Sequence, residues 1–322
     1  MAATYSGSGV DNSIGTIVKQ ITSRMDEIVK KESVTAGMNA SAEITAAFNS
    51  SATAKLPTMS TDGLGDYDKV KGYPYGAATI EWTEYTLAYD RGIRIDIDRK
   101  DKVQTDGLAS TAAAAAQLMR LQVIPEIDAT RLSGAVAKTK AALASHVIEE
   151  TAAPTKANLL SKIGAGLDAI YEERGIDSGS TIYLNNNMKS VLRESSEYTK
   201  VKQVSGVPNI DLTTESIDGN PIVWVPSARM KTIYSYNTPG ATSGNKGGIA
   251  PGTDAQDIYF VIVAPGCAQG VTVFSEPKFI DASINQSKDA DSLMYRLYHD
   301  VIVEKNSGAS GIYAQCGKKA SS

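Results

Sequence analysis

Cysteine and histidine are both scarce in this chain of 322 residues, which contains two of each. Two thiols are too few for a disulfide scaffold, and so small a set of cysteines and histidines argues against a zinc cluster. The cysteines are Cys267 and Cys316, and the histidines are His146 and His299. Neither cysteine lies in a C-x-x-C pair or among basic residues, so the sequence indicates no reactive thiol.

Excess positive charge and long apolar runs are lacking too. Lysine and arginine total 32 against 36 acidic residues, a net charge of -4, whereas tight electrostatic binding of nucleic acid needs a basic surface. The longest uninterrupted apolar run covers residues 258–264, far short of the roughly 20 residues that span a bilayer. Residues 1–10 have no charged start and no apolar stretch, so we expect no secretory signal. We therefore expect the protein to stay in a reducing compartment.

The remaining composition is that of an ordinary globular protein, with 42% hydrophobic and 21% charged residues. The length predicts about two domains of roughly 150 residues each. Helical and strand patterns mix without strict alternation, which predicts an α+β class. Tyrosine supplies 15 residues, against 4 phenylalanines and 2 tryptophans. That preference suits subunit interfaces, and a core built mainly from tyrosine would explain it equally well.

The clearest strand signal lies in the first third of the chain. Residues 93–98 alternate apolar and charged side chains, and residues 79–89 are rich in β-branched and aromatic ones. Because residues 90–92 separate the two runs, we expect a long polar β-hairpin or a pair of extended strands, preceded by a loop at 55–71. Each arm of about ten residues would reach roughly 35 Å. An isolated ribbon is marginally stable in water, so another subunit is expected to support it.

Two longer helices are predicted. Residues 106–140 combine an alanine run with leucine and isoleucine at helical spacing, and Pro125 interrupts them. No glycine or asparagine beside Pro125 ends a turn, so we expect one bent helix, with two helices joined there as the alternative. A second amphipathic helix is expected at 155–174, with Thr155 as N-cap and Gly175 after the last turn. Further predictions are a helix at 187–195, strands at 181–184, 222–225, 257–264, 271–274 and 295–303, and an exposed loop at 238–253.

Residues 1–56 are rich in serine, threonine and alanine and contain one amphipathic pattern, over residues 14–29. An arm that binds a neighbouring subunit would show this narrow apolar stripe. A helix docked on its own domain would show the same stripe, so the pattern leaves both interpretations open.

Catalytic and metal-binding patterns are weak. His299 lies within a strand pattern, which favours a structural histidine over a catalytic base. Asp96, Asp98 and Asp101 could be drawn as metal ligands, but the basic residues around them favour a solvated, salt-bridged surface. The glycine-rich stretch 240–252 lacks the G-x-x-x-x-G-K-[ST] spacing of a phosphate-binding loop. The sequence therefore indicates a protein that is not an enzyme and uses no cofactor or metal.

Four stretches, in chain order, share one resemblance. They are Asp62–Tyr67 continuing through Trp82 to residues 90–96; V-I-P-E-I-D at 123–128; I-D-G-N-P-I-V-W-V-P at 217–226 with Arg229 and Met230; and Y-R-L-Y-H-D-V at 295–301 with residues 311–313. Together they resemble the major capsid proteins of tailed double-stranded DNA bacteriophages of the Hong Kong 97 type, especially those of phages that infect Gram-positive bacteria.

That resemblance implies a capsid fold with named parts. These are an N-terminal arm (1–56), an extended β-hairpin called the E-loop (57–100), a first part of the P-domain with a long spine helix (101–151), an A-domain (152–268), and P-domain return strands with the C-terminus (269–322). The E-loop would lie across a neighbouring subunit. Since large aromatic and arginine side chains dominate interface energetics, Trp82, Tyr85, Tyr89 and Arg91 are the predicted intersubunit contacts.

The resemblance also implies function and partners. The chain would be a structural subunit of an icosahedral phage head, assembled in the host bacterial cytoplasm into hexamers and pentamers. The shell would enclose double-stranded DNA without sequence-specific binding, contact a portal protein, and involve no membrane. The arm is shorter than the scaffolding domain that some relatives carry, so we expect a separate scaffolding protein. The type member of this family cross-links its subunits through lysine and asparagine side chains, and Lys69, Lys71 and Asn306 are the residues that could take such roles here. That chemistry also needs a buried acidic catalyst. The sequence identifies none, so we expect no cross-links.

Two other interpretations compete with a phage head. A subunit of an encapsulin-like bacterial nanocompartment would share the fold and enclose protein cargo in place of a genome. A small cytoplasmic enzyme is the more distant alternative, and its candidate residues would be His299, Asp300 and Cys267.

Overall fold

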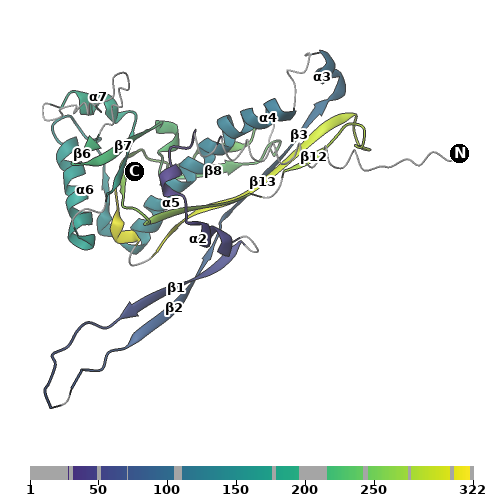
Figure 1. Cartoon of the computed structure of the whole chain (residues 1–322). Coiled ribbons are helices and arrows are strands. Elements are labelled where there is room, and N and C mark those ends of the chain that lie inside the picture. Colours follow the sequence, from purple (N-terminus) through teal and green to yellow (C-terminus); the bar gives the residue numbers. More distant parts are fainter. Residues whose placement is uncertain are drawn as a thin grey trace, which may run out of the picture.

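The computed structural model describes residues 28, 32–48, 52–70, 72–104, 111–175, 179–195, 216–241, 246–274, 277–304 and 308–319. A six-stranded sheet, a four-stranded sheet and a long helix form the body, and a two-stranded hairpin projects far from it (Figure 1). Except for Ile28, the predicted amphipathic segment 14–29 lies outside the described residues.

The six-stranded sheet holds the main hydrophobic core. Its central strand β10 is buried along nearly its whole length, which explains the continuous apolar run noted in the sequence. The strands pair antiparallel except at β14–β4 and β5–β7, which are parallel. Their order is β4 (Val147–Glu150), β14 (Ile312–Gly317), β10 (Ile258–Val263), β5 (Thr181–Asn185), β7 (Asn220–Val225) and β6 (Ser216–Ile217).

The four-stranded sheet is built around one long strand, β13 (Ala290–Val303). Strand β3 (Tyr89–Asp98) pairs with one edge of β13, and β11 (Ala268–Phe274) and β12 (Lys278–Ile280) follow each other along the opposite edge. All of these pairs are antiparallel. The strands predicted at 271–274 and 295–303 are confirmed, and each begins earlier than expected because pairing extends along the whole of β13.

The long helix is continuous from Thr111 to Ala142, so the prediction of one helix through Pro125 is confirmed. Residues 106–110 of the predicted span lie outside the described residues. The helix consists of α4 (Thr111–Leu118), a π-helical turn η2 (Met119–Val123) and α5 (Ile124–Ala142). At the end of the π turn the Ile124 N–H donates to the Met119 carbonyl, five residues back. Pro125 follows directly, so the irregular turn falls where proline removes a donor from the helix ladder. Helix α5 then packs on β13 and β14, which joins the two sheets.

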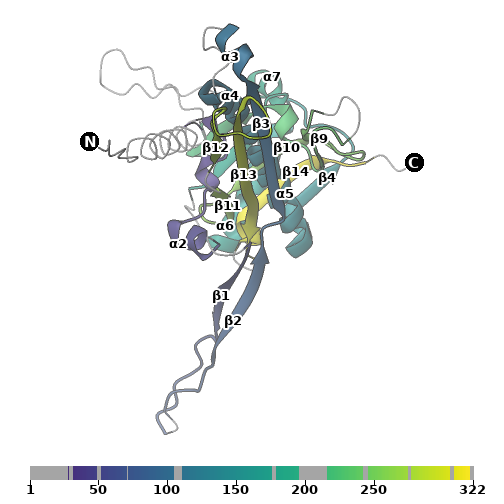
Figure 2. The same ribbon diagram turned by 90° about the vertical axis from the view of Figure 1, so that its right-hand side faces the viewer.

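The predicted hairpin between residues 79–89 and 93–98 is wrong. Strand β2 (Ala78–Thr86) pairs with β1 (Thr53–Thr61), most of which lies in the segment 55–71 expected as a loop. Residues 89–98 form the single strand β3, which pairs with β13. The projecting hairpin is therefore β1–β2, and β3 belongs to the body (Figure 1, Figure 2).

The remaining elements mostly follow expectation. Helix α6 (Leu159–Arg174) ends at Gly175, whose φ is 84°, but it does not begin at Thr155. Instead the Thr155 N–H donates to Asn158 Oδ1 at 2.7 Å, in the turn before the helix. Part of the predicted loop 238–253 is a strand, β9, which pairs with β8. The shorter elements are η1 (Ala36–Met38), α2 (Ala42–Ala47), α3 (Arg99–Gln104), η3 (Ala144–His146), α7 (Met188–Arg193), η4 (Ser227–Arg229), β8 (Tyr234–Asn237), β9 (Gly248–Pro251) and η5 (Ala309–Gly311).

Candidate subunit interface

The outer half of the hairpin carries its apolar residues on one face. In an antiparallel pair, directly opposite residues point to the same side of the sheet. Pro57 lies opposite Trp82, and Met59 lies opposite Ile80, so these four side chains share a face. Exposed fractions are 67% for Met59, 59% for Ile80 and 63% for Trp82. We call Pro57, Met59, Ile80 and Trp82 the outer strip.

Nearer the body, the apolar residues lie on the opposite face. Ala54 lies opposite Tyr85, and Leu56, two residues further along β1, points to the same side. These side chains pack with Leu87 and Phe48 in a small core at the base of the hairpin. The apolar side thus changes from one face to the other along the hairpin. Its inner half packs on the body of the same subunit, and its outer half faces solvent.

The loop at the tip of the hairpin adds further exposed apolar side chains. Asp62 closes this loop, because its backbone N–H donates to the Ala77 carbonyl at 3.0 Å and its carboxylate accepts from the Ala77 N–H at 2.8 Å. Tyr67 and Tyr73 pack with their ring centroids 5.0 Å apart. Most large apolar side chains left exposed in the described part of the chain lie on the hairpin: Met59, Leu64, Tyr67, Val70, Tyr73, Tyr75, Ile80 and Trp82. Such a concentration marks an interaction surface.

Comparisons with solved structures identify this architecture. The chain matches the bacteriophage PhiM1 mature capsid with a TM-score of 0.58, at 13% identity over 85% of each chain. It matches Mycobacterium phage Ogopogo with a TM-score of 0.51, at 12% identity over 90% of this chain and 92% of that one. The match to the capsid of the Cyanophage P-SCSP1u has a TM-score of 0.51, at 9% identity over 85% of each chain. This is the Hong Kong 97-type capsid fold. No protein-family model matches the sequence, and no curated protein matches it significantly.

The capsid fold confirms the α+β class, which was predicted from the helix and strand patterns, and it confirms the resemblance to phage capsid proteins. The four predicted contact residues occupy different parts of it. Trp82 lies in the exposed outer strip, whereas Tyr85 packs in the core at the hairpin base. Burial, with a smaller contribution from the nearby Glu304 charge, raises the pKa of Tyr85. The role of these residues between subunits stays a prediction.

Tyr89 and Arg91 lie on β3, within the body of the capsid fold. Arg91 Nε donates to Glu126 Oε1 at 2.7 Å, and its NH2 group donates to the Asn237 carbonyl at 3.0 Å. The Tyr89 ring lies 4.4 Å from that of Tyr236, centroid to centroid. Tyr89 therefore connects β3 to the β8–β9 hairpin, and Arg91 connects β3 to both that hairpin and α5, inside one subunit. Sequence reasoning could not show these contacts, because Glu126 and Asn237 lie far from Arg91 in the chain.

Glu126 is the acidic partner at this junction. It lies on α5, 6% exposed, with the His299 Nε2 atom 3.6 Å from its Oε1. Burial alone would raise the pKa of Glu126, but His299 and Arg91 outweigh it and the pKa lies below its ordinary value. His299 is buried in β13, so its predicted place in a strand is confirmed.

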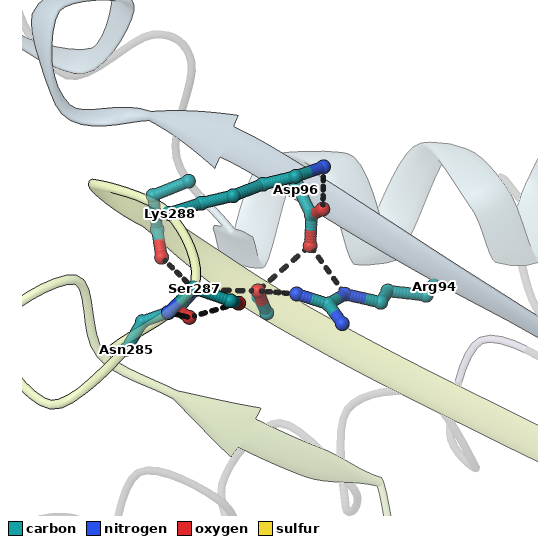
Figure 3. A network of polar contacts seen from close by, with 7 residues as sticks. Arg94, Asp96, Asn285, Ser287 and Lys288 are labelled. Atoms are coloured by element: carbon teal, nitrogen blue, oxygen red, sulfur yellow. Dashed lines mark hydrogen bonds and ion pairs between the residues drawn. The ribbon is translucent and has the colours of Figure 1, made fainter.

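A second polar network joins the ends of β3 and β13 farthest from the hairpin (Figure 3). Asp96 Oδ1 accepts from Ser292 Oγ and Arg94 Nε, each at 2.7 Å, and Oδ2 accepts from Lys288 Nζ at 2.9 Å. The hydrogen bond from Ser292, with those from Arg94 and Lys288, holds the pKa of Asp96 well below its usual range. The salt-bridged surface predicted for Asp96 is confirmed. Among the described residues, no group of histidine, cysteine, aspartate and glutamate side chains is arranged to hold a metal ion.

A cavity of about 210 Å³ lies between β3, the long helix and the turn that joins β8 to β9. Arg91 and Glu126 in its wall bind each other, and Leu118, Val123 and other apolar side chains line much of the rest.

Asp300, a residue of the enzyme alternative, accepts from the Ala88 N–H at 3.3 Å and so holds the junction of β2 and β3. Among the described helices, none is long and apolar enough to cross a membrane.

Sequence reasoning found Trp82 and missed much of the surface around it. Pro57 and Met59 lie on β1, where the proline and the nearby glycines suggested a loop. A signal was present: residues 54–59 alternate between the two faces of the strand, with Ala54 and Leu56 on one side and Pro57 and Met59 on the other. Proline is tolerated there because β1 is an edge strand.

Proposed function

We propose that this chain is the structural subunit of an icosahedral bacteriophage head, which assembles into hexamers and pentamers around packaged double-stranded DNA. The observation that carries the proposal is the outer strip, an open apolar surface on a projecting hairpin of a capsid fold. The solved structures that the chain resembles include phage capsids and the capsid of an empty GTA particle, the latter with a TM-score of 0.50.

The geometry favours a second copy of the chain as the partner of the outer strip. The hairpin stands away from the rest of the described body, so no other described part of the subunit lies within reach of the strip (Figure 1, Figure 2). Burying a side chain such as Met59, Ile80 or Trp82 contributes about 1.5–3 kcal/mol. One such contact is modest, but a closed symmetric shell repeats it at every subunit.

Charge supports enclosure of DNA without tight binding to it. The net charge of -4 provides no basic excess, and a shell with such subunits would let the genome move during packaging and release. The proposal includes a portal protein and a separate scaffolding protein as partners and places the mature subunit in the virion. It assigns the chain no catalytic role, no cofactor and no metal.

Negative-stain electron microscopy with light scattering tests the proposal. The protein would be expressed alone and with its neighbouring genes. Uniform closed shells, or capsomer rings that close when a partner is supplied, are expected. A monodisperse monomer or dimer under every condition would overturn the proposal and favour the enzyme alternative.

Two further measurements on purified native particles separate the related possibilities. A 260/280 nm absorbance ratio dominated by nucleic acid supports a phage head, and a protein-like ratio with cargo supports a nanocompartment. Denaturing gels test the prediction that subunits are not cross-linked, and covalent ladders would contradict it. Lys69 lies in the exposed tip of the hairpin, whereas Lys71 and Asn306 lie outside the described residues.

A further inference from the structure

Residues 33–48 run as a strap over the body, between the N-terminal segment and the hairpin. The strap contains η1 and α2 and ends at Phe48. Figures 1 and 2 both place α2 where the β1–β2 hairpin meets the body. Two separate sets of contacts hold the strap, one polar set at its start and one apolar set at its end.

At its start, the strap binds a buried carboxylate. Asp128, on α5, is 0% exposed. Its Oδ1 atom accepts from Ser33 Oγ and Thr35 Oγ1, each at 2.6 Å, and from the Thr35 N–H at 3.2 Å. Its Oδ2 atom accepts from the Val34 N–H at 3.3 Å and from Arg229 at 2.9 Å. A carboxylate is costly to bury without partners, and here the strap supplies most of the hydrogen bonds that satisfy it.

Arg131 lies one helical turn further along α5 and binds the strap on the same side. Its NH1 group donates to the Thr35 carbonyl at 3.1 Å, and NH2 donates to Thr272 Oγ1 at 3.0 Å and to the Gly270 carbonyl at 3.4 Å. A Cβ atom at position 270 would overlap the guanidinium, so this glycine makes room for it. Burial lowers the pKa of Arg131 to about 10, so the side chain remains charged at neutral pH.

At its end, the strap supports the hairpin. The Ala40 N–H donates to the Gly270 carbonyl at 3.0 Å, which directs the chain along β11. Phe48, 2% exposed, then packs against Ala54 and Leu87 from the hairpin base. The small core formed there is separate from the main core of the six-stranded sheet. The strap is therefore a physical connection from α5 to the residues on which the hairpin stands.

We propose that Asp128 and Arg131 are positioning residues that lock the strap on the body and thereby brace the base of the β1–β2 hairpin. Releasing the lock loosens the strap and the hairpin base together and leaves the main core intact. The inference concerns the single subunit and does not depend on the proposed function. Its test therefore uses the unassembled full-length chain.

Hydrogen exchange followed by mass spectrometry tests the lock in the Asp128→Asn variant. Three groups of amides report on it: Met38 and Ala40 in the strap, Leu87 and Ala88 at the hairpin base, and the β10 amides in the main core. Exchange is expected to rise at least tenfold in the strap and at the hairpin base, with β10 unchanged. Asp168→Asn, on the exposed face of α6, is the matched control and is expected to change none of the three groups.

Three results would overturn the proposal. Faster exchange in the strap alone would show that the strap does not brace the hairpin. An equal rise in β10 would show that Asp128 serves general stability, and no change anywhere would show that there is no lock. If Asp128→Asn does not fold, Thr35→Val removes a donor to Asp128 at nearly constant volume, and the same expectations and the same three contrary results apply to it.

A second variant separates the two ends of the strap. Phe48→Ala removes the apolar support and leaves the contacts of Asp128 in place. We expect at least tenfold faster exchange at Leu87 and Ala88, with Met38 protected as in the wild type. Wild-type exchange at the hairpin base in this variant would contradict the bracing role.

Discussion

Trp82 faces Pro57 across the hairpin, on the same side as the neighbouring pair Met59 and Ile80. The outer strip formed by these residues is open to solvent, while the inner half of the hairpin turns its apolar side to its own body. This change of side separates residues that stabilise the subunit from residues available to a partner, and it makes the two roles testable by separate variants.

Trp82→Ala is expected to impair shell assembly without unfolding the subunit. The side chain is 63% exposed, so the free energy of unfolding should change by no more than about 0.5 kcal/mol. Loss of an aromatic anchor from an interface costs about 2 kcal/mol or more per contact. Urea unfolding and particle yield by light scattering measure the two effects. Glu81→Ala, on the other face, is the control and should assemble normally, and normal assembly of Trp82→Ala would argue against an interface role for the outer strip.

Arg91→Ala is expected to destabilise the subunit itself. Removing one partner of a buried ion pair leaves the other charge unpaired and costs about 3–5 kcal/mol. Because the Arg91 side chain is 23% exposed and His299 remains 3.6 Å from Glu126, we expect about 3 kcal/mol, the lower end of that range. Urea unfolding of the unassembled chain provides the measurement. Unchanged stability together with lost assembly would instead place Arg91 at an interface, as the sequence predicted.

Acid is expected to weaken the network around Asp96. The pKa of this carboxyl is lowered in the folded state, so its contribution is complete above its unfolded value of about 4. The contribution is lost as the pH falls from there toward the folded pKa. Asp96→Asn should therefore be less stable than the wild type at pH 7, and the difference should shrink below about pH 4. Unfolding curves over that range test the sign, and a difference that grows in acid would contradict it.

Two glycines in helices provide a matched test of packing. A Cβ at Gly134, in α5, would lie 2.7 Å from Val301 Cγ1, whereas nothing lies within 4 Å of a Cβ at Gly164, in α6. Gly134→Ala should destabilise by about 1–3 kcal/mol, because overlap with β13 outweighs the gain in helix propensity. Gly164→Ala should stabilise by about 0.5–1 kcal/mol. Thermal unfolding of both variants tests the contrast, and stabilisation by both would show that α5 has room to shift.

Both thiols are expected to be inert in the folded subunit. Burial, with the nearby Glu149 charge, raises the pKa of Cys316 to about 12, and burial also raises the pKa of Cys267. Because the thiolate is the reactive form, iodoacetamide at pH 8 should label neither cysteine in the native chain and both in guanidinium chloride. Rapid native labelling of Cys267 would renew interest in the enzyme alternative.

Local patterns predicted those elements whose stability depends on their own residues. The apolar run of β10, the stripe of α6 and the long helix through Pro125 all appear where sequence periodicity placed them, with shifts of a few residues at their ends. The helix bounds near Thr155 were wrong because one Asn158 side chain completes a turn before the helix begins. The capsid fold itself was indicated by four short stretches taken in order.

Strand partners were decided by the tertiary structure. Residues 79–86 could pair with the segment before them or with the segment after them in the chain. The regular alternation of residues 93–98 favoured the later segment, but the true partner is β1, the earlier one. The sequence by itself determined that residues 93–98 form a strand with one apolar face, since alternation is local. It could not determine that this strand pairs with β13, about two hundred residues away, because strand pairing depends on which segments meet in the folded chain. For the same reason Arg91 was identified as important, but only the fold showed that its partner is Glu126 on the long helix.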